Sequence, residues 1–226
     1  MELGDLARAT LQLIKDRRSI RQFKPDAVPD EALEIILESG RQAPSGEDAQ
    51  PWRFVVVKNR VVIQKLGEIS GRGSGRRFTG EFLTKKLQER FKGLEDPVKR
   101  EAVFKKLTSG QVSSFVGTAP VVLAVCGKKG VWDLPYDCSA AIENILLMVT
   151  ALGLGACWVI APCIDVRDEL DIKALLNVPE DVKVISLIPI GWPARNPGPR
   201  PRLPLDEISF LDSYGVPLFR GGEADA

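Results

Sequence analysis

Histidine is absent from the 226-residue chain, and its absence excludes several common kinds of active site. Without an imidazole the chain cannot form a Ser-His-Asp triad, a Cys-His pair or a histidine-ligated zinc site. We therefore expect no metal centre and no catalytic histidine. Any chemistry of this protein is better supplied by a bound organic cofactor.

Cysteine is scarce as well, with four residues in the whole chain. The closest two, Cys157 and Cys163, are too far apart for the C-x-x-C pair of a metal or iron–sulfur site. All four lie in or beside apolar segments, which predicts buried, unreactive thiols. The absence of a disulfide pattern fits a reducing, cytoplasmic location.

The chain also lacks a strong net charge and long apolar runs. Its formal net charge of +1 gives no general attraction to nucleic acid or to an anionic membrane. No apolar run approaches the roughly 20 residues that span a bilayer, and the first residues do not resemble a secretory signal. We expect neither nucleic acid nor a membrane as a partner.

The apolar pattern predicts helices and strands in mixed order. It favours an amphipathic helix before residue 17 and a second helix that Asp30 caps and that stops near Gly40. Compact apolar segments predict four strands, at residues 52–57, 120–126, 156–160 and 182–190. Residues 136–152 are nearly uncharged, which predicts a helix buried in the monomer or in a subunit interface. A further helix is expected at 166–176. Strands and helices do not alternate strictly, so we expect an α+β fold.

Residues 58–110 differ from the rest of the chain in charge. They hold 14 Lys and Arg against 6 Asp and Glu, a net of +8, whereas the remainder has a net of −7. One interpretation is a pair of solvated helices that cover an edge of the core. Another is a mobile lid that steers an anionic substrate or a nicotinamide dinucleotide phosphate. A nucleic-acid patch is disfavoured, because no aromatic platform accompanies the charges.

Two segments near the N-terminus are the most informative. The first reads Arg17-Arg18-Ser19-Ile20-Arg21 and places three guanidiniums and a hydroxyl where they can bind a phosphate. The second, residues 43–54, reads A-P-S-G-E-D-A-Q-P-W-R-F, a turn whose backbone N–H groups can face a bound ring. Alone, the arginines could merely offset a helix dipole, and the turn could be an ordinary connection. Together they indicate a phosphorylated ligand with a ring.

The C-terminal segment is rich in proline, with six prolines between residues 193 and 217. Such a segment is extended and needs a surface to lie on, for which a partner subunit is a natural choice. Its Arg200 and Arg202 could return to the phosphate region or simply keep the segment soluble.

Five blocks in order resemble the FMN-dependent nitroreductase family: R-R-S-I-R, A-P-S-G-x-x-x-Q-P-W-R-F, A-L-G-L-G-A-C-W, G-W-P and P-R-P-R-x-P-L-D-E. The resemblance covers nearly the whole chain except the basic stretch. It implies one α+β domain over residues 1–226, with a central mixed, mainly antiparallel sheet flanked by helices, in an intertwined homodimer. A basic helical insert or lid would occupy about 60–115, and a dimer-embracing tail about 193–226.

The resemblance also implies an FMN site that both chains build, without a catalytic side chain because FMN carries the hydride chemistry. Arg17, Arg18, Ser19 and Arg21 would hold the phosphate and the pyrimidine side of the flavin, with Arg202 and its helper Arg200 at the phosphate. Pro44, Ser45 and Gly46 of the other subunit would lie against the ring, Gln50 near the ribityl chain or the supporting turn, and the backbone of Ile160 and Ala161 near the reactive edge. Asp48 stands where many members have Asn, and its role stays open.

The implied activity is the reduction of an electron-poor small molecule, such as a nitroaromatic or a quinone, by NADH or NADPH in a ping-pong mechanism. Two alternatives within the family are a reductive dehalogenase and an enzyme that consumes its own flavin. An alternative of another class is a flavin-binding module without turnover.

Overall fold

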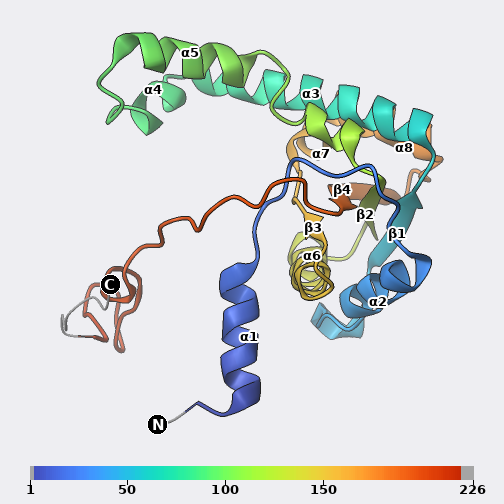
Figure 1. Cartoon of the computed structure of the whole chain (residues 1–226), viewed down its shortest axis with the longest axis horizontal. Coiled ribbons are helices and arrows are strands. Elements are labelled where there is room, and N and C mark those ends of the chain that lie inside the picture. Colours follow the sequence, from blue (N-terminus) through green and yellow to red (C-terminus); the bar gives the residue numbers. More distant parts are fainter. Residues whose placement is uncertain (1–2, 220–226) are drawn as a thin grey trace.

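An antiparallel sheet forms the centre of the fold in the computed structural model, which describes residues 3–219 (Figure 1). Its strands lie in the order β1-β2-β4-β3. Their bounds are Trp52–Val57 for β1, Val121–Lys128 for β2, Gly155–Ala156 for β3 and Val182–Gly191 for β4. A parallel bridge from Ser19 to Ala156 adds the N-terminal segment to the edge of this sheet. The predicted α+β fold with a mixed, mainly antiparallel sheet is confirmed.

Helices cover both faces of the sheet (Figure 1). One face packs against α2 (Asp30–Arg41) and α6 (Leu134–Ala151), and the other against α3 (Arg60–Leu83), the 3₁₀ helix η2 (Ser114–Thr118), α7 (Ala161–Ile164) and α8 (Val166–Leu176). Along β2, Leu123 and Val125 face the first group while Val122 and Ala124 face the second. Both faces are therefore apolar, and burying one such leucine or valine stabilises the fold by about 1.5–3 kcal/mol.

Helix α6 is buried within the monomer along one face, as its uniform apolarity predicts. Ile142 and Ile145 are fully buried against the sheet and α2. Gly40 allows α2 to come this close, because a Cβ there would lie 2.7 Å from the Cδ1 atom of Ile145. The opposite face of α6 is only half-buried. Among the described residues, no helix combines the length and the apolarity needed to cross a membrane.

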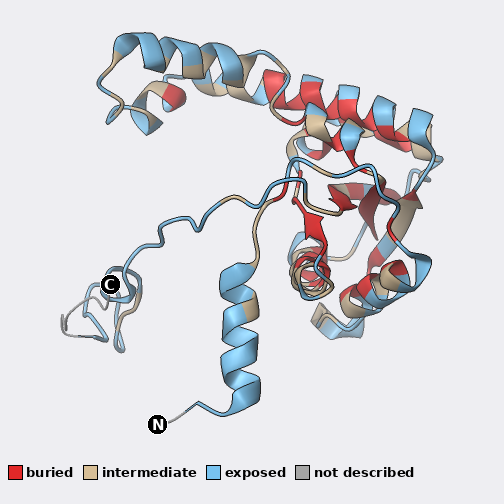
Figure 2. Cartoon of the chain, viewed as in Figure 1, coloured by how far each residue is buried: buried red, intermediate tan, exposed pale blue. Residues whose placement is uncertain are grey.

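Helix α3 joins the sheet layer to a projecting arm. In its first half Ile63 and Leu66 are fully buried in the core, whereas its outer half runs away from the sheet beside α4 (Lys86–Arg90) and α5 (Pro97–Thr108) and is mostly exposed (Figure 2). The first half of α3 thus covers the core with one face, and whether the arm is a cover or a mobile lid stays open. The extent of the insert stays a prediction.

A buried carboxylate holds the middle of α3 against α8. Asp168 is fully buried, and its Oδ1 atom accepts hydrogen bonds from Arg72 Nε, at 2.9 Å, and from Arg76. A Cβ at Gly73 would lie 2.9 Å from the Cα atom of Pro162, so α3 and α7 pack backbone to backbone beside this network.

Two predicted elements differ from the structure. Asp30 is the first residue of α2 and Pro29 takes the cap position, so the aspartate assists only by its charge near the positive end of the helix dipole. The strand predicted at 156–160 shrinks to β3, and Val159 alone pairs further on, with Leu187. After Val159 the chain leaves the sheet, since α7 begins at Ala161 and Pro162 in its first turn cannot donate a backbone hydrogen bond to a neighbouring strand.

The two ends of the chain extend away from the sheet (Figure 1). Helix α1 (Asp5–Asp16) has no buried residue, and its Leu6 is 82% exposed (Figure 2). The extended segment after residue 193 contains one short helix, α9 (Leu205–Ile208), and exposes Leu205 and Tyr214. The monomer thus leaves apolar side chains of both ends uncovered. Residues 220–226 of the predicted tail lie outside the described residues.

Candidate functional site

The segment that follows α1 lies between β3 and the start of the C-terminal tail. Ile20 donates its backbone N–H to Ala156 at 2.8 Å, and Ala194 donates to Gln22 at 2.9 Å. Only glycine fits at position 155 in β3, because a Cβ there would lie 2.6 Å from a side-chain carbon of Ile20. This pairing brings the arginines at 17–21 next to the beginning of the tail, although about 175 residues separate them in sequence.

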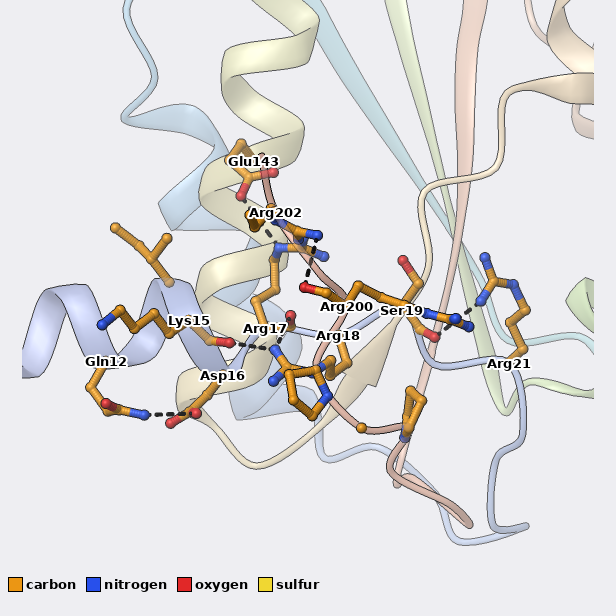
Figure 3. Close-up of a pocket in the computed structure, with 14 residues that line it drawn as sticks. Gln12, Lys15, Asp16, Arg17, Arg18, Ser19, Arg21, Glu143, Arg200 and Arg202 are labelled. Atoms are coloured by element: carbon orange, nitrogen blue, oxygen red, sulfur yellow. Dashed lines mark hydrogen bonds and ion pairs between the residues drawn. The ribbon is translucent and has the colours of Figure 1, made fainter. Parts of the chain in front are cut away.

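A cavity of about 810 Å³ opens between α1, α6 and the tail (Figure 3). Its volume lies within the roughly 300–1,000 Å³ of ligand sites. Six of the residues predicted from the sequence line it together: Arg17, Arg18, Ser19, Arg21, Arg200 and Arg202.

We call the cavity that these six residues line the phosphate cavity. Its lining carries more positive than negative charge. Among the described residues, Arg17 is the one arginine of the five with a carboxylate partner, Glu143, whose Oε1 lies 3.5 Å from its Nε. Arg18, Arg21 and Arg202 donate to backbone carbonyls of nearby residues instead. A bound anion with several acceptor oxygens would satisfy these guanidiniums.

An offset of the helix dipole explains only part of this arrangement. Arg18 donates to the carbonyl of Lys15 in the last turn of α1, as that interpretation requires. Arg200 and Arg202 come from the tail, however, and have no role at the end of α1. Their convergence on the same cavity favours a ligand.

A smaller cavity of about 180 Å³ lies between α3 and residues 157–161. Ile160 and Ala161 line it, and Arg21 lines both cavities. Arg21 lies over Phe115 on one side, with its guanidinium carbon 5.9 Å from the ring centroid. Arg77 of α3 also lines it and has the same distance to Phe78.

Arg77 is a residue that sequence reasoning did not single out. It stands in the basic stretch and shares one face of α3 with Ser74 and Phe78, at helical spacings of three and four residues. The spacing in the sequence could have shown that Arg77 shares a helix face with Ser74 and Phe78. It could not have shown which cavity this face of α3 lines.

The turn at residues 43–50 lines neither cavity within the described part of the chain. It contains the 3₁₀ helix η1 (Gly46–Asp48) and contacts α6, where Asp137 Oδ1 accepts a 3.0 Å hydrogen bond from the N–H of Gly46. Gln50 donates its N–H to Ser45 Oγ, also at 3.0 Å. The structure therefore does not bring Pro44, Ser45, Gly46 or Gln50 to the arginines of the same chain.

A family model supplies the decisive comparison. The model described as the nitroreductase family matches residues 14–192. The chain belongs to the nitroreductase family.

Relatives of known name agree with this membership. A proposed NADH dehydrogenase/NAD(P)H nitroreductase of Methanothermobacter thermautotrophicus is 33% identical over 202 residues, covering 88% of this chain and 84% of the relative. An iodotyrosine deiodinase of Thermotoga neapolitana is 27% identical, with coverage of 87% and 93%. Among solved structures, a nitroreductase with bound FMN from Bacteroides fragilis is 26% identical with a TM-score of 0.60, covering 93% of this chain and 98% of that one.

The match to the nitroreductase family includes most, but not all, of the predicted site. Arg17 to Arg21, the turn at 43–50 and Ile160–Ala161 lie inside the matched residues, whereas Arg200 and Arg202 lie beyond them. The two tail arginines are thus placed by the geometry of this chain, through the pairing of Ala194 with Gln22.

The cysteines do not contribute a reactive group to the site. All four are buried, and burial raises the pKa of Cys126 and Cys138 to about 12. Burial also raises the pKa of Cys157, which lines the smaller cavity. Thiols that stay protonated at neutral pH are poor nucleophiles, in agreement with the prediction from the sequence. Among residues 3–219 no cluster of Cys, Asp and Glu could hold a metal ion.

Proposed function

We propose that the chain binds FMN and acts as an oxidoreductase that takes electrons from NADH or NADPH and passes them to an electron-poor small molecule. The observation that carries this proposal is the set of arginines without carboxylate partners in the phosphate cavity. A phosphate monoester has the charge and the oxygens to satisfy them.

We assign the two cavities, which share Arg21, to the two ends of FMN. Arg17, Arg18 and Ser19, with Arg200 and Arg202, would hold the phosphate in the larger cavity. Arg21 lines both cavities, so the ring would extend past it into the smaller one, beside Arg77 and the backbone of Ile160 and Ala161.

A homodimer would complete the site. The turn with Pro44, Ser45 and Gly46 does not reach the arginines of its own chain, so we assign it to the ring of the partner's flavin. The uncovered apolar residues of α1 and of the tail, Leu6 and Leu205 among them, support a partner surface over both ends. The half-buried face of α6 would lie in the same interface.

The residues of the chain would position the ligands and stabilise charge. When bound, FMN supplies hydride transfer from the nicotinamide and to the acceptor. Arg21 would place positive charge beside the smaller cavity, where negative charge develops upon reduction, while the charge of Arg77 is already paired with Glu81, whose Oε1 lies 3.0 Å from Arg77 Nε. Hydride transfer needs no side-chain acid or base, in keeping with a site without histidine. Donor and acceptor would use one site in turn, which predicts ping-pong kinetics.

Reductive dehalogenation is a second candidate. The iodotyrosine deiodinase relative, alignable over 87% of this chain, favours it, and a flavin-consuming reaction has no comparable support. A flavin-binding module without turnover is the candidate from another class.

One series of measurements tests these proposals. Purified protein is examined for flavin absorbance, is reconstituted with FMN and is then mixed anaerobically with NADH or NADPH in a stopped-flow instrument. Bleaching of the flavin is expected, whereas a module would bind FMN and not bleach. No uptake of FMN would remove the proposal. Steady-state rates with a nitroarene, a quinone and a halotyrosine then identify the class of electron acceptor. Intersecting double-reciprocal lines would count against a ping-pong mechanism.

A further inference from the structure

Asp137 is a buried carboxylate at the start of α6 whose place the proposed function does not explain. It is 5% exposed. Its Oδ1 atom accepts the 3.0 Å hydrogen bond from Gly46, and its Oδ2 atom is buried without a partner among the described residues. Burying a carboxylate is unfavourable, so its position at this turn calls for a reason.

The turn that Asp137 holds has an unusual backbone. Glu47, Asp48 and Gln50 have φ angles of 54°, 53° and 43°, in the left-handed region. Such residues cost of the order of 1 kcal/mol or more each and persist where the surroundings fix them. Bonds inside the turn, such as Ala49 N–H to Gly46 O at 3.0 Å, shape it but do not place it on the molecule.

The hydrogen bond to Asp137 ties the middle of the turn to the rest of the fold, whereas the ends of the turn are tied to α2 and β1, through Ala43 N–H to Gly40 O at 3.2 Å and Arg53 to Gln50 O at 3.3 Å. In the described part of the chain, the bond to Asp137 is the one hydrogen bond from residues 44–49 to another element. The helix also comes close to the backbone here, since a Cβ at Gly46 would lie 2.6 Å from Asp133 Oδ2. Asp137 thus fixes where Gly46 lies, and Pro44 and Ser45 follow directly from it.

We propose that Asp137 is a positioning residue for the flavin ring. Its carboxylate orients the N–H of Gly46 and thereby sets the surface that Pro44 and Ser45 present to the FMN of the partner subunit. The proposal rests on the proposed function, because it assumes that this turn meets the ring. Asp137 itself does not touch the flavin.

Two substitutions of similar size separate the hydrogen bond from the space that the side chain fills. Asp137→Asn keeps an acceptor oxygen and removes the charge, whereas Asp137→Leu removes the acceptor. We expect Asp137→Leu to weaken FMN binding about tenfold, the loss expected for a charge-assisted hydrogen bond at its lower limit, and to change the visible circular dichroism of bound FMN. Asp137→Asn should restore both to within about twofold of the wild-type values.

Controls distinguish positioning from folding and from charge. Asp26→Asn and Asp26→Leu make the same changes at an exposed aspartate that lines neither cavity and has no hydrogen bond to the turn, and should leave FMN binding unchanged. Thermal unfolding of each apoprotein reports on the fold. If Asp137→Leu does not fold, Asp137→Glu keeps the charge and displaces the acceptor by one methylene, and we expect it to alter the circular dichroism of bound FMN.

Three results would overturn the proposal. The first is wild-type FMN affinity and circular dichroism in Asp137→Leu or, if that variant does not fold, in Asp137→Glu. The second is the same defect in Asp137→Asn as in Asp137→Leu, and the third is an equal defect in the Asp26 variants. A wild-type protein that binds no FMN would instead refute the proposed function, and this outcome differs from all three.

Discussion

Replacing Arg202 by glutamine removes one guanidinium from the phosphate cavity and leaves the folded core untouched. Arg202 lies on the exposed tail and donates to the carbonyl of Pro201, with no carboxylate partner among residues 3–219. A hydrogen bond to a charged group contributes about 1.5–3 kcal/mol. Because this side chain is exposed, we take the lower limit, which corresponds to about tenfold weaker binding of FMN.

The assay compares two flavins and two variants. FMN and riboflavin differ in the phosphate, so Arg202→Gln should weaken the binding of FMN, measured by quenching of flavin fluorescence, and leave that of riboflavin unchanged. Arg195→Gln is the matched control, since Arg195 is exposed on the same tail but does not line the cavity. Equal loss in the two variants, or an equal loss of riboflavin binding, would refute the assignment of Arg202 to the phosphate.

Three further predictions concern the framework of the site. Gly155→Ala should displace Ile20 and the adjoining arginines, lowering stability by about 1–3 kcal/mol in urea unfolding and weakening FMN binding. Gly93→Ala, which has open space around it and lines neither cavity, should do neither. Asp168→Ala should destabilise the fold by about 2 kcal/mol, which is less than the usual loss from a buried ion pair. The loss is smaller because the side chains of its partners Arg72 and Arg76 are 47% and 31% exposed. An unchanged urea midpoint would contradict this prediction. Since burial raises the pKa of Cys126 and Cys138 from 9.0 to about 12, the stability from their protonated thiols is complete below pH 9 and is lost as the pH rises toward 12. The melting temperature should therefore fall between pH 9 and 11, and iodoacetamide at pH 8 should label the unfolded protein but not the native one.

The parts of the fold that depend on local pattern could be predicted from the sequence. Strand β1 and helix α8 lie at the predicted residues, because the apolar run of one and the spacing of the other are complete within a short window. The strand predicted at 156–160 is wrong for most of its length. Cys157 and Val159 are buried by packing in the core, while only Ala156 lies in β3 and Val159 forms a single bridge to Leu187.

The site divides in the same way. Arg17, Arg18 and Arg21 are neighbours in sequence, so a common cavity could be expected from their chemistry. Arg77 reaches the smaller cavity only because glycines let α3 pack backbone to backbone against α7, as at Gly73. Such a close approach is a property of the assembled layers and leaves no mark in the spacing of charged residues.

Helix α6 contacts two different parts of the proposed site. Glu143 on this helix pairs with Arg17 in the phosphate cavity, and Asp137, six residues earlier, holds the turn at Gly46. In the proposed dimer the first contact belongs to one flavin and the second to the other. A phosphate that draws Arg17 away from Glu143 would then change a contact of α6, and the same helix holds, through Asp137, the turn that lies against the flavin ring of the partner subunit. The two sites would be thermodynamically linked, and the affinity for the second FMN would differ from that for the first.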